Sequence, residues 1–263
     1  MWGAIIGDLA GSIYEYDQTK KVTLVNVNNL IEKSSFYSDD TILTIAILDA
    51  FLNDKNYEKY LKEYAIKFLN YKPNHQPYFQ RPFSPGFVKW VTSNTEGKSN
   101  GNGAMMRISP IGYLSSTEEE LITNATLATI CSHNTDEAIT SATTIAKFIY
   151  LAKKGYSKED IFEKLNIKPK YIPFDKFNMT CNATIDNCLY AISVTNSFEE
   201  AIRLIISFGG DTDTNACIVG TIAEALYGID KSLIEQAKEK IPVEFTDKLE
   251  QGYAYIKKDY QLW

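Results

Sequence analysis

The sequence Gly209-Gly210-Asp211-Thr212-Asp213-Thr214-Asn215 joins two apolar segments, residues 201–208 and 216–227, whose spacing is that of helices. The two glycines permit a tight bend, and Asp and Thr favour the start of the second helix. A helix cap needs only one side-chain oxygen, whereas this turn presents the carboxylates of Asp211 and Asp213 and a threonine hydroxyl. Because two unshielded carboxylates repel each other, we expect a cation between them.

A second acidic turn of the same kind, Ser38-Asp39-Asp40-Thr41, directly precedes the apolar helical segment 42–52. Acidic residues at a helix start are typically worth under about 1 kcal/mol each at an exposed site, so two independent helix caps are the alternative interpretation. Four aspartates in two matching turns exceed what capping needs. Ligand sets made only of oxygen suit a hard cation such as Mg²⁺, Mn²⁺ or Ca²⁺ rather than zinc.

The rest of the chain has helical periodicity and almost no period-2 alternation, which predicts an all-α fold. The sequence contains no internal repeat, low-complexity tract or linker, and we expect residues 1–263 to form a single domain. Besides an N-terminal helix that ends at Gly11, the expected helices are 42–52, 57–69, 87–92, 118–130, 137–153, 158–165, 181–193, 198–208, 216–227, 231–241 and 244–257.

Glycine recurs every four residues in the N-terminal helix, at Gly3, Gly7 and Gly11. This spacing leaves one helix face bare, so we expect another core helix to pack closely against it. Residues 17–37 are expected to form a loop that could include a short strand at 22–27. Residues 73–85, with four prolines and His75, are expected to form an ordered surface loop.

A glycine-rich segment, Gly97-Lys98-Ser99-Asn100-Gly101-Asn102-Gly103, runs into a helical turn and could cradle a phosphate with its backbone amides. It is not a P-loop, because Thr92 stands where the first glycine would be and no strand leads in. A purely structural turn is the alternative. His133, in a break before the helix 137–153, either caps that helix or faces a ligand.

Composition excludes several classes of protein. The net charge of −6 and the absence of a basic stripe argue against general nucleic-acid binding. The four cysteines form no CxxC pair and are expected to be reduced core thiols. Because the sequence has neither a signal peptide nor a membrane span, we expect a soluble, cytoplasmic protein that has no membrane partner, and we expect a monomer.

Five motifs, taken in order, resemble the ADP-ribosylglycohydrolase family. The first is Gly3-Ala4-Ile5-Ile6-Gly7-Asp8 with Gly11-Ser12-Ile13-Tyr14-Glu15, and the others are Ser38-Asp39-Asp40-Thr41, Gly101-Asn102-Gly103-Ala104-Met105-Met106-Arg107, Ser132-His133-Asn134 and Gly209-Gly210-Asp211-Thr212-Asp213-Thr214. The resemblance covers nearly the whole chain. Its N-terminal Gly-Ser-Ile-Tyr-Glu segment resembles the branch of the family that acts on serine-linked and polymeric ADP-ribose.

The resemblance implies a compact orthogonal multi-helix bundle with a dinuclear metal site, two Mg²⁺ or Mn²⁺ ions, in a central cleft. It implies an enzyme that releases ADP-ribose from a protein side chain, a nucleic acid or a small conjugate. Glu15 is the expected catalytic residue, and Asp40 could assist it. The implied metal ligands are Ser38, Asp39, Asp40, Asp211, Asp213 and Thr214, with Asp213 bridging. The implied substrate-binding residues are Ser99, Asn100, Gly101, Asn102, Gly103 and His133.

Two departures from the family pattern affect these expectations. Ser38 stands where threonine is usual, which keeps the hydroxyl. Asn100 replaces a tyrosine that contacts adenine in several relatives, so stacking on the base must come from elsewhere or be weaker. Two other functions are compatible with the sequence: a catalytically weak protein that senses ADP-ribose, and a nucleotide phosphohydrolase, whose products would differ.

Overall fold

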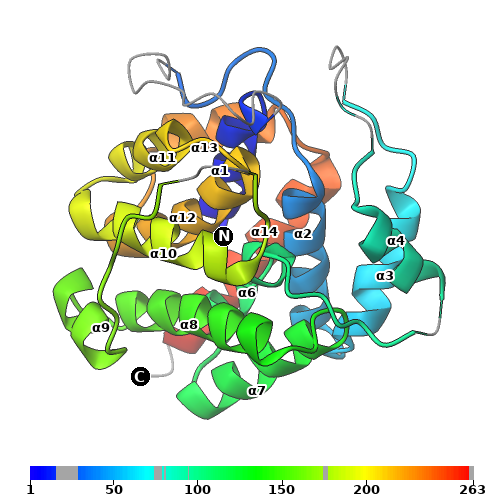
Figure 1. The fold of residues 1–263 in the computed structure, drawn as a ribbon, viewed down its shortest axis with the longest axis horizontal. Coiled ribbons are helices and arrows are strands. Elements are labelled where there is room, and N and C mark those ends of the chain that lie inside the picture. Colours follow the sequence, from blue (N-terminus) through cyan, green and yellow to red (C-terminus); the bar gives the residue numbers. More distant parts are fainter. Residues whose placement is uncertain (16–28, 74–78, 80, 94, 174–176, 261–263) are drawn as a thin grey trace.

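The computed structural model consists of helices packed around a central pair, α1 (Trp2–Gly11) and α12 (Thr212–Tyr227) (Figure 1). The structure describes residues 1–15, 29–73, 79, 81–93, 95–173 and 177–260. Within these residues there is no strand and the only sheet-like pairs are two isolated bridges, Lys98 with His133 and Gly101 with Thr180. The prediction of an all-α fold is therefore confirmed.

Each expected helix is present, with ends that differ by a few residues. α2 and α12 begin earlier than expected because the acidic residues before each apolar segment are themselves helical. α6 was not expected, because six residues are too few to show a helical period. The remaining helices are α2 (Asp39–Leu52), α3 (Tyr57–Lys67), α4 (Pro85–Thr92), α5 (Gly103–Met106), α6 (Ser109–Leu114), α7 (Glu118–Ile130), α8 (Asp136–Lys153), α9 (Lys158–Lys164), α10 (Cys181–Val194), α11 (Phe198–Ser207), α13 (Lys231–Lys238) and α14 (Val243–Tyr260).

α1 lies directly against α12 along its bare glycine face. A Cβ atom at Gly7 would lie 2.0 Å from the carbonyl oxygen of Ala216, and one at Gly3 would lie 2.1 Å from that of Gly220. Gly11 approaches the start of α12 in the same way. The prediction that another core helix packs closely on these glycines is confirmed. The close contact also sets Asp8, on α1, beside the first turn of α12.

The core extends through the whole helical assembly. Every residue of α1 is buried, and α2 is buried from Asp40 to Phe51. The four cysteines are free thiols, and three of them are buried, as expected. In the part of the chain that the structure describes, no helix has the length and apolar character needed to cross a bilayer. The possible strand at 22–27 and His75 lie outside the described residues.

Candidate active site

The two acidic turns lie at the N-termini of α2 and α12 and contact each other. Ser38 is the N-cap of α2, and its Oγ accepts a hydrogen bond from the Asp40 amide at 3.1 Å. Asp211 has the equivalent position before α12, but its side chain caps no amide of that helix. Thr214 Oγ1 donates to Asp40 Oδ2 at 3.1 Å, although the two residues are 174 positions apart. The structure thus brings the two predicted turns together.

Asp8 is a third acidic element of the site, and the sequence analysis did not assign it a role. Its Oδ2 accepts hydrogen bonds from the Ser38 amide at 2.9 Å, the Thr41 amide at 3.1 Å and Thr41 Oγ1 at 2.6 Å. Asp8 therefore caps α2 from another helix. A carboxylate inside an otherwise apolar helix, directly after Gly7, was the signal that could have identified it.

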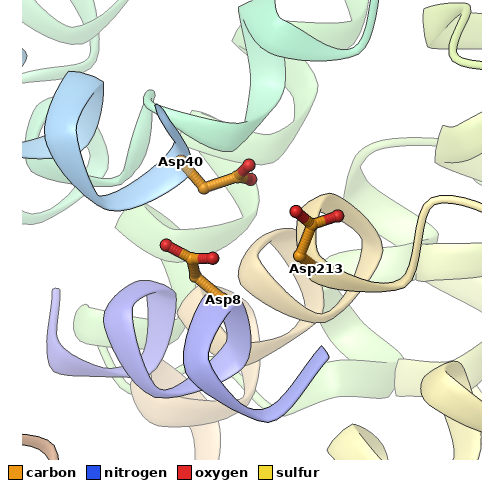
Figure 2. A group of neighbouring side chains, drawn as sticks. All are labelled: Asp8, Asp40 and Asp213. Atoms are coloured by element: carbon orange, nitrogen blue, oxygen red, sulfur yellow. The ribbon is translucent and has the colours of Figure 1, made fainter. Parts of the chain in front are cut away.

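The carboxylates form two groups that share Asp213. One group is Asp8, Asp40 and Asp213, whose side chains point toward one another from three helices (Figure 2). The other is Glu15, Asp211 and Asp213. In each group one oxygen from every residue lies within 4.8 Å of the others. Groups of carboxylate oxygens suit hard divalent cations, and Asp213 belongs to both groups.

Two buried oxygens support this fit. Asp8 Oδ1 and Asp40 Oδ1 are both inaccessible to solvent, and neither has a hydrogen-bond partner among the described residues. A buried polar atom without a partner costs free energy, about 1–3 kcal/mol and more when it is charged. A cation between these oxygens would remove that cost, which is the physical reason to expect one there.

The electrostatics of the carboxylates also favour the binding of positive charge. Burial raises the pKa of Asp8 to about 6. Burial, and then repulsion from Asp211 and Asp8, raises the pKa of Glu15 to about 8. The pKa values of Asp40 and Asp213 lie well above their ordinary range, mainly through burial and then through neighbouring carboxylates. Such clustered, raised pKa values are typical of functional sites.

A cleft of about 730 Å³ opens over these residues. Of the predicted catalytic and metal-binding residues, Ser38 and Asp40 are buried and do not line it. Its acidic wall is formed by Glu15, Asp39, Asp211 and Asp213 together with Thr214. Its other walls include the glycine-rich loop and the aromatic side chains of Phe83, Phe87 and Trp90.

The glycine-rich loop packs against the segment around His133 and is hydrogen-bonded to it. A Cβ atom at Gly97 would lie 2.2 Å from Ser132 Cα, so this approach requires glycine. The Ser99 amide donates to Ser132 O at 3.3 Å, and the Asn134 amide donates to Gly97 O at 2.8 Å. Backbone pairing of this kind holds the loop at a fixed place in the cleft wall.

The loop also reaches the acidic group. Asn102 Nδ2 donates to Asp211 Oδ2 at 2.7 Å and to Thr184 Oγ1 at 3.2 Å. Asn102 therefore orients a predicted metal ligand, in addition to lining the cleft. Asn100 is the one predicted substrate-binding residue that does not line the cleft, because its amide points to Glu137 Oε2 at 3.5 Å.

His133 lines the cleft and does not cap the following helix. Thr135 caps α8 instead, with its Oγ1 accepting from the Ala138 amide at 3.3 Å. The capping alternative for His133 is therefore wrong. Its imidazole is buried close to Arg107, and burial followed by that positive charge holds the pKa of His133 well below its ordinary value.

A family model described as ADP-ribosylglycohydrolase matches residues 1–261. The chain belongs to the ADP-ribosylglycohydrolase family. This match confirms the resemblance indicated by the five motifs, and the protein is a glycohydrolase of that family. The buried acidic groups are the part of its structure that could hold metal ions.

Three relatives of this glycohydrolase share low sequence identity with it. ADP-ribosylarginine hydrolase Tri1 of Pseudomonas putida (strain GB-1) is 23% identical over 265 residues, which cover 86% of this chain and 69% of that protein. Human ADP-ribosylhydrolase ARH3 is 22% identical, over 87% of this chain and 84% of that protein. A solved structure described as an ADP-ribosylglycohydrolase-related protein complex has a TM-score of 0.72 at 18% identity, covering 99% and 95% of the two chains. The two chains share the fold.

Proposed function

We propose that this protein hydrolyses the glycosidic bond between ADP-ribose and an acceptor and that it uses two divalent cations, Mg²⁺ or Mn²⁺. The observation that carries the proposal is the pair of buried acidic groups sharing Asp213, beside a cleft bounded by a glycine-rich loop. The relatives named for ADP-ribosylarginine and ADP-ribosyl hydrolysis support the substrate class. The partner is an ADP-ribosylated protein, nucleic acid or small molecule.

The residues divide between the two ions according to the two groups. Asp8 and Asp40, with Asp213, would hold one ion, and Asp211 and Asp213 would hold the other, with the Glu15 carboxylate beside them. Ser38, Asp39 and Thr214 add oxygen ligands at the same two helix starts. When bound, divalent cations of this kind polarise sugar hydroxyls and acidify water near the anomeric carbon.

Glu15 is the proposed base. Its carboxylate lies in the cleft wall, in the same group as Asp211 and Asp213, where it can accept a proton from the attacking water. A water oxygen attacks the anomeric carbon while the bond to the acceptor breaks with oxocarbenium character. One proton of that water passes to Glu15, which later returns it to solvent. The leaving acceptor keeps the bonding electron pair and takes up a proton from solvent. The products are ADP-ribose and the free acceptor.

Other parts of the cleft would bind the substrate. The Gly103 amide is the proposed backbone donor to the diphosphate, because the amides of Ser99, Gly101 and Asn102 already donate within the protein. The Asn102 side chain keeps Asp211 oriented as the substrate enters. Asn100 points away from the cleft, so stacking on adenine would come from other residues, and the partly exposed Phe87 is one candidate in the cleft wall.

Product analysis tests the proposal. The protein is incubated with arginine-, serine- and nucleotide-linked ADP-ribose and with O-acetyl-ADP-ribose, in Mg²⁺, Mn²⁺ or EDTA, and products are identified by mass spectrometry. We expect intact ADP-ribose from one linkage in the presence of metal only. Release of AMP or phosphate would indicate a phosphohydrolase instead. Metal-dependent ADP-ribose binding without release from any linkage would indicate a sensor.

Replacement of the proposed base gives a sharper prediction. We expect Glu15→Gln to lower kcat by about 100-fold or more, because general-base catalysis typically contributes 10²–10⁴-fold, with ADP-ribose affinity little changed. Steady-state kinetics and calorimetric titration measure the two effects. Glu96→Gln is the matched control: Glu96 also lines the cleft, but it pairs with Lys98 at 2.9 Å. Turnover of Glu15→Gln at the wild-type rate would remove Glu15 from the mechanism.

A further inference from the structure

Three side chains form a hydrogen-bonded chain behind the glycine-rich loop. Arg107 Nη2 donates to Ser132 Oγ at 2.5 Å. Ser132 Oγ lies 2.8 Å from His133 Nδ1, and Arg107 Nη2 lies 3.4 Å from the same nitrogen. All three residues are buried and line the substrate cleft.

The contacts in this chain favour one arrangement of protons. A guanidinium group only donates, so Ser132 Oγ accepts from Arg107 and has its own proton left to donate. His133 Nδ1 faces both that hydroxyl and a second donor, Arg107 Nη2, so it is placed to accept and carries no proton itself. A neutral imidazole with an unprotonated Nδ1 has its proton on Nε2. The low pKa of His133, caused by burial and then by Arg107, keeps the ring neutral.

The protonated nitrogen lies under the glycine-rich loop. A Cβ atom at Gly103 would lie 3.3 Å from His133 Nε2, and one at Gly101 would lie 3.8 Å from it. Among the residues that the structure describes, no hydrogen-bond partner of Nε2 is found. Glycine at both positions leaves room for a ligand oxygen beside this nitrogen.

We propose that Arg107 and Ser132 are positioning residues that hold His133 as the neutral Nε2–H tautomer. The family resemblance already implies that His133 binds substrate, and this tautomer would present a hydrogen-bond donor to a diphosphate oxygen of the bound substrate. The identity of the ligand rests on the proposed function, whereas the tautomer depends only on the contacts within this chain. A neutral donor keeps its hydrogen bond without the desolvation cost of a buried imidazolium.

The tautomer is measured on the free protein by nitrogen-15 NMR of the imidazole rings near neutral pH. The chain has two histidines, so His75→Gln assigns the two spectra. We expect His133 to show a protonated Nε2 and an unprotonated, hydrogen-bonded Nδ1. We expect Ser132→Ala to weaken this signature by removing the donor to Nδ1, and Ser132→Thr to restore it. A protonated Nδ1 in the wild-type protein would overturn the inference.

The ligand contact is measured by titration of ADP-ribose in Mn²⁺ into variants of His133. We expect His133→Phe, which keeps a ring but has no donor, to weaken binding about tenfold or more, since a hydrogen bond to a charged group is lost. His133→Gln, which retains an N–H donor, should recover part of the loss. Thermal unfolding identifies any variant that loses affinity by failing to fold.

The tautomer of His133 and its contact with the ligand are tested independently. Wild-type affinity in His133→Phe would overturn the ligand contact even if the NMR signature is as expected. If the wild-type protein itself binds no ADP-ribose, the proposed function fails, and the ligand contact fails with it. The imidazole spectrum still decides whether Ser132 sets the tautomer, because it is recorded without ligand or metal.

Discussion

At the scale of single residues, Asp8 affects both the stability of the protein and its proposed metal binding. One of its oxygens caps α2 with three hydrogen bonds, and the other is buried without a partner beside Asp40 and Asp213. A carboxylate that did nothing but cap would be satisfied on both oxygens or exposed to water. The unpaired oxygen is a cost to the metal-free protein that a bound cation would offset.

Asp8→Asn separates these two roles, because an amide keeps the acceptor oxygen and removes the charge. We expect the metal-free variant to be about 1 kcal/mol more stable than the wild type, since a donor replaces the unpaired oxygen facing Asp40. We expect Mn²⁺ affinity to fall about 10–100-fold. Chemical unfolding in EDTA and calorimetric titration of Mn²⁺ measure the two quantities.

Asp49→Asn is the matched control for this change. Asp49 is also on α2, but it pairs with Lys248 Nζ at 2.7 Å and with the Tyr64 hydroxyl at 2.9 Å, away from the cleft. We expect this control to lose stability and to keep the Mn²⁺ affinity of the wild type. Unchanged Mn²⁺ affinity in Asp8→Asn would show that Asp8 acts only as a helix cap.

At the scale of elements, the contact between α1 and α12 sets the geometry of the acidic groups. Backbone lies directly on backbone at Gly3, Gly7 and Gly11, without intervening side chains. Asp8 and Asp213 belong to these two helices, so the separation of their carboxylates depends on this close packing (Figure 2). A helix pair at the usual separation of 8–10 Å between axes would move them apart.

Gly7→Ala tests this dependence. A Cβ there would lie 2.0 Å from the Ala216 carbonyl oxygen, so the helices must separate. We expect a loss of about 3 kcal/mol or more in the free energy of unfolding, together with weaker Mn²⁺ binding in the molecules that fold. Gly86→Ala on α4, where a Cβ meets nothing within 4 Å, should instead leave stability unchanged or raise it by up to about 1 kcal/mol. Equal stability of the two variants would contradict the close-packing account.

At the scale of the whole molecule, folding concentrates negative charge in the interior. Asp8, Asp40 and Asp213 come from α1, α2 and α12, and the fold buries all three. Protons are then the alternative to metal ions as a source of positive charge. Because the pKa of Asp8 is raised to about 6 and that of Glu15 to about 8, the metal-free folded protein binds protons that the unfolded chain releases.

The sign of the pH dependence follows from these raised pKa values. The metal-free protein should lose stability as pH rises from the ordinary carboxyl pKa of about 4 toward about 8, because the folded state must give up its extra protons. Metal binding releases the same protons, so Mn²⁺ affinity should rise over this range and level off above about pH 8.

Thermal unfolding with excess Mn²⁺ and with EDTA measures this linkage. The difference in Tm should widen as pH rises from about 5.5 to about 8, and Mn²⁺ at 100 times its Kd should stabilise by about 2.7 kcal/mol. His133 has a lowered pKa and contributes stability that is lost as pH falls below about 6.5, but it does so with and without metal, so its contribution cancels in the difference. A Tm difference that is constant across this range would contradict proton release on metal binding.

Much of the fold was predictable because its signals are local. Helical periodicity, caps and bare glycine faces involve residues within one or two turns of each other, so the all-α class, the helix order and the close face of α1 could be predicted. The missed helix α6 is too short for a period to be visible. The acidic turns were recognised for the same reason, since each one lies within four residues of sequence.

The sequence by itself thus determined the helical class, the two acidic turns and the glycine face. Only the tertiary structure decided which side chains meet: Asp8 joined the acidic group, Asn100 turned to Glu137, and Arg107 reached His133 through Ser132. The physical reason is that these contacts depend on packing between elements far apart in the chain. Thr214 and Asp40 are 174 residues apart in the sequence, and no local sequence pattern indicates that their side chains are in contact.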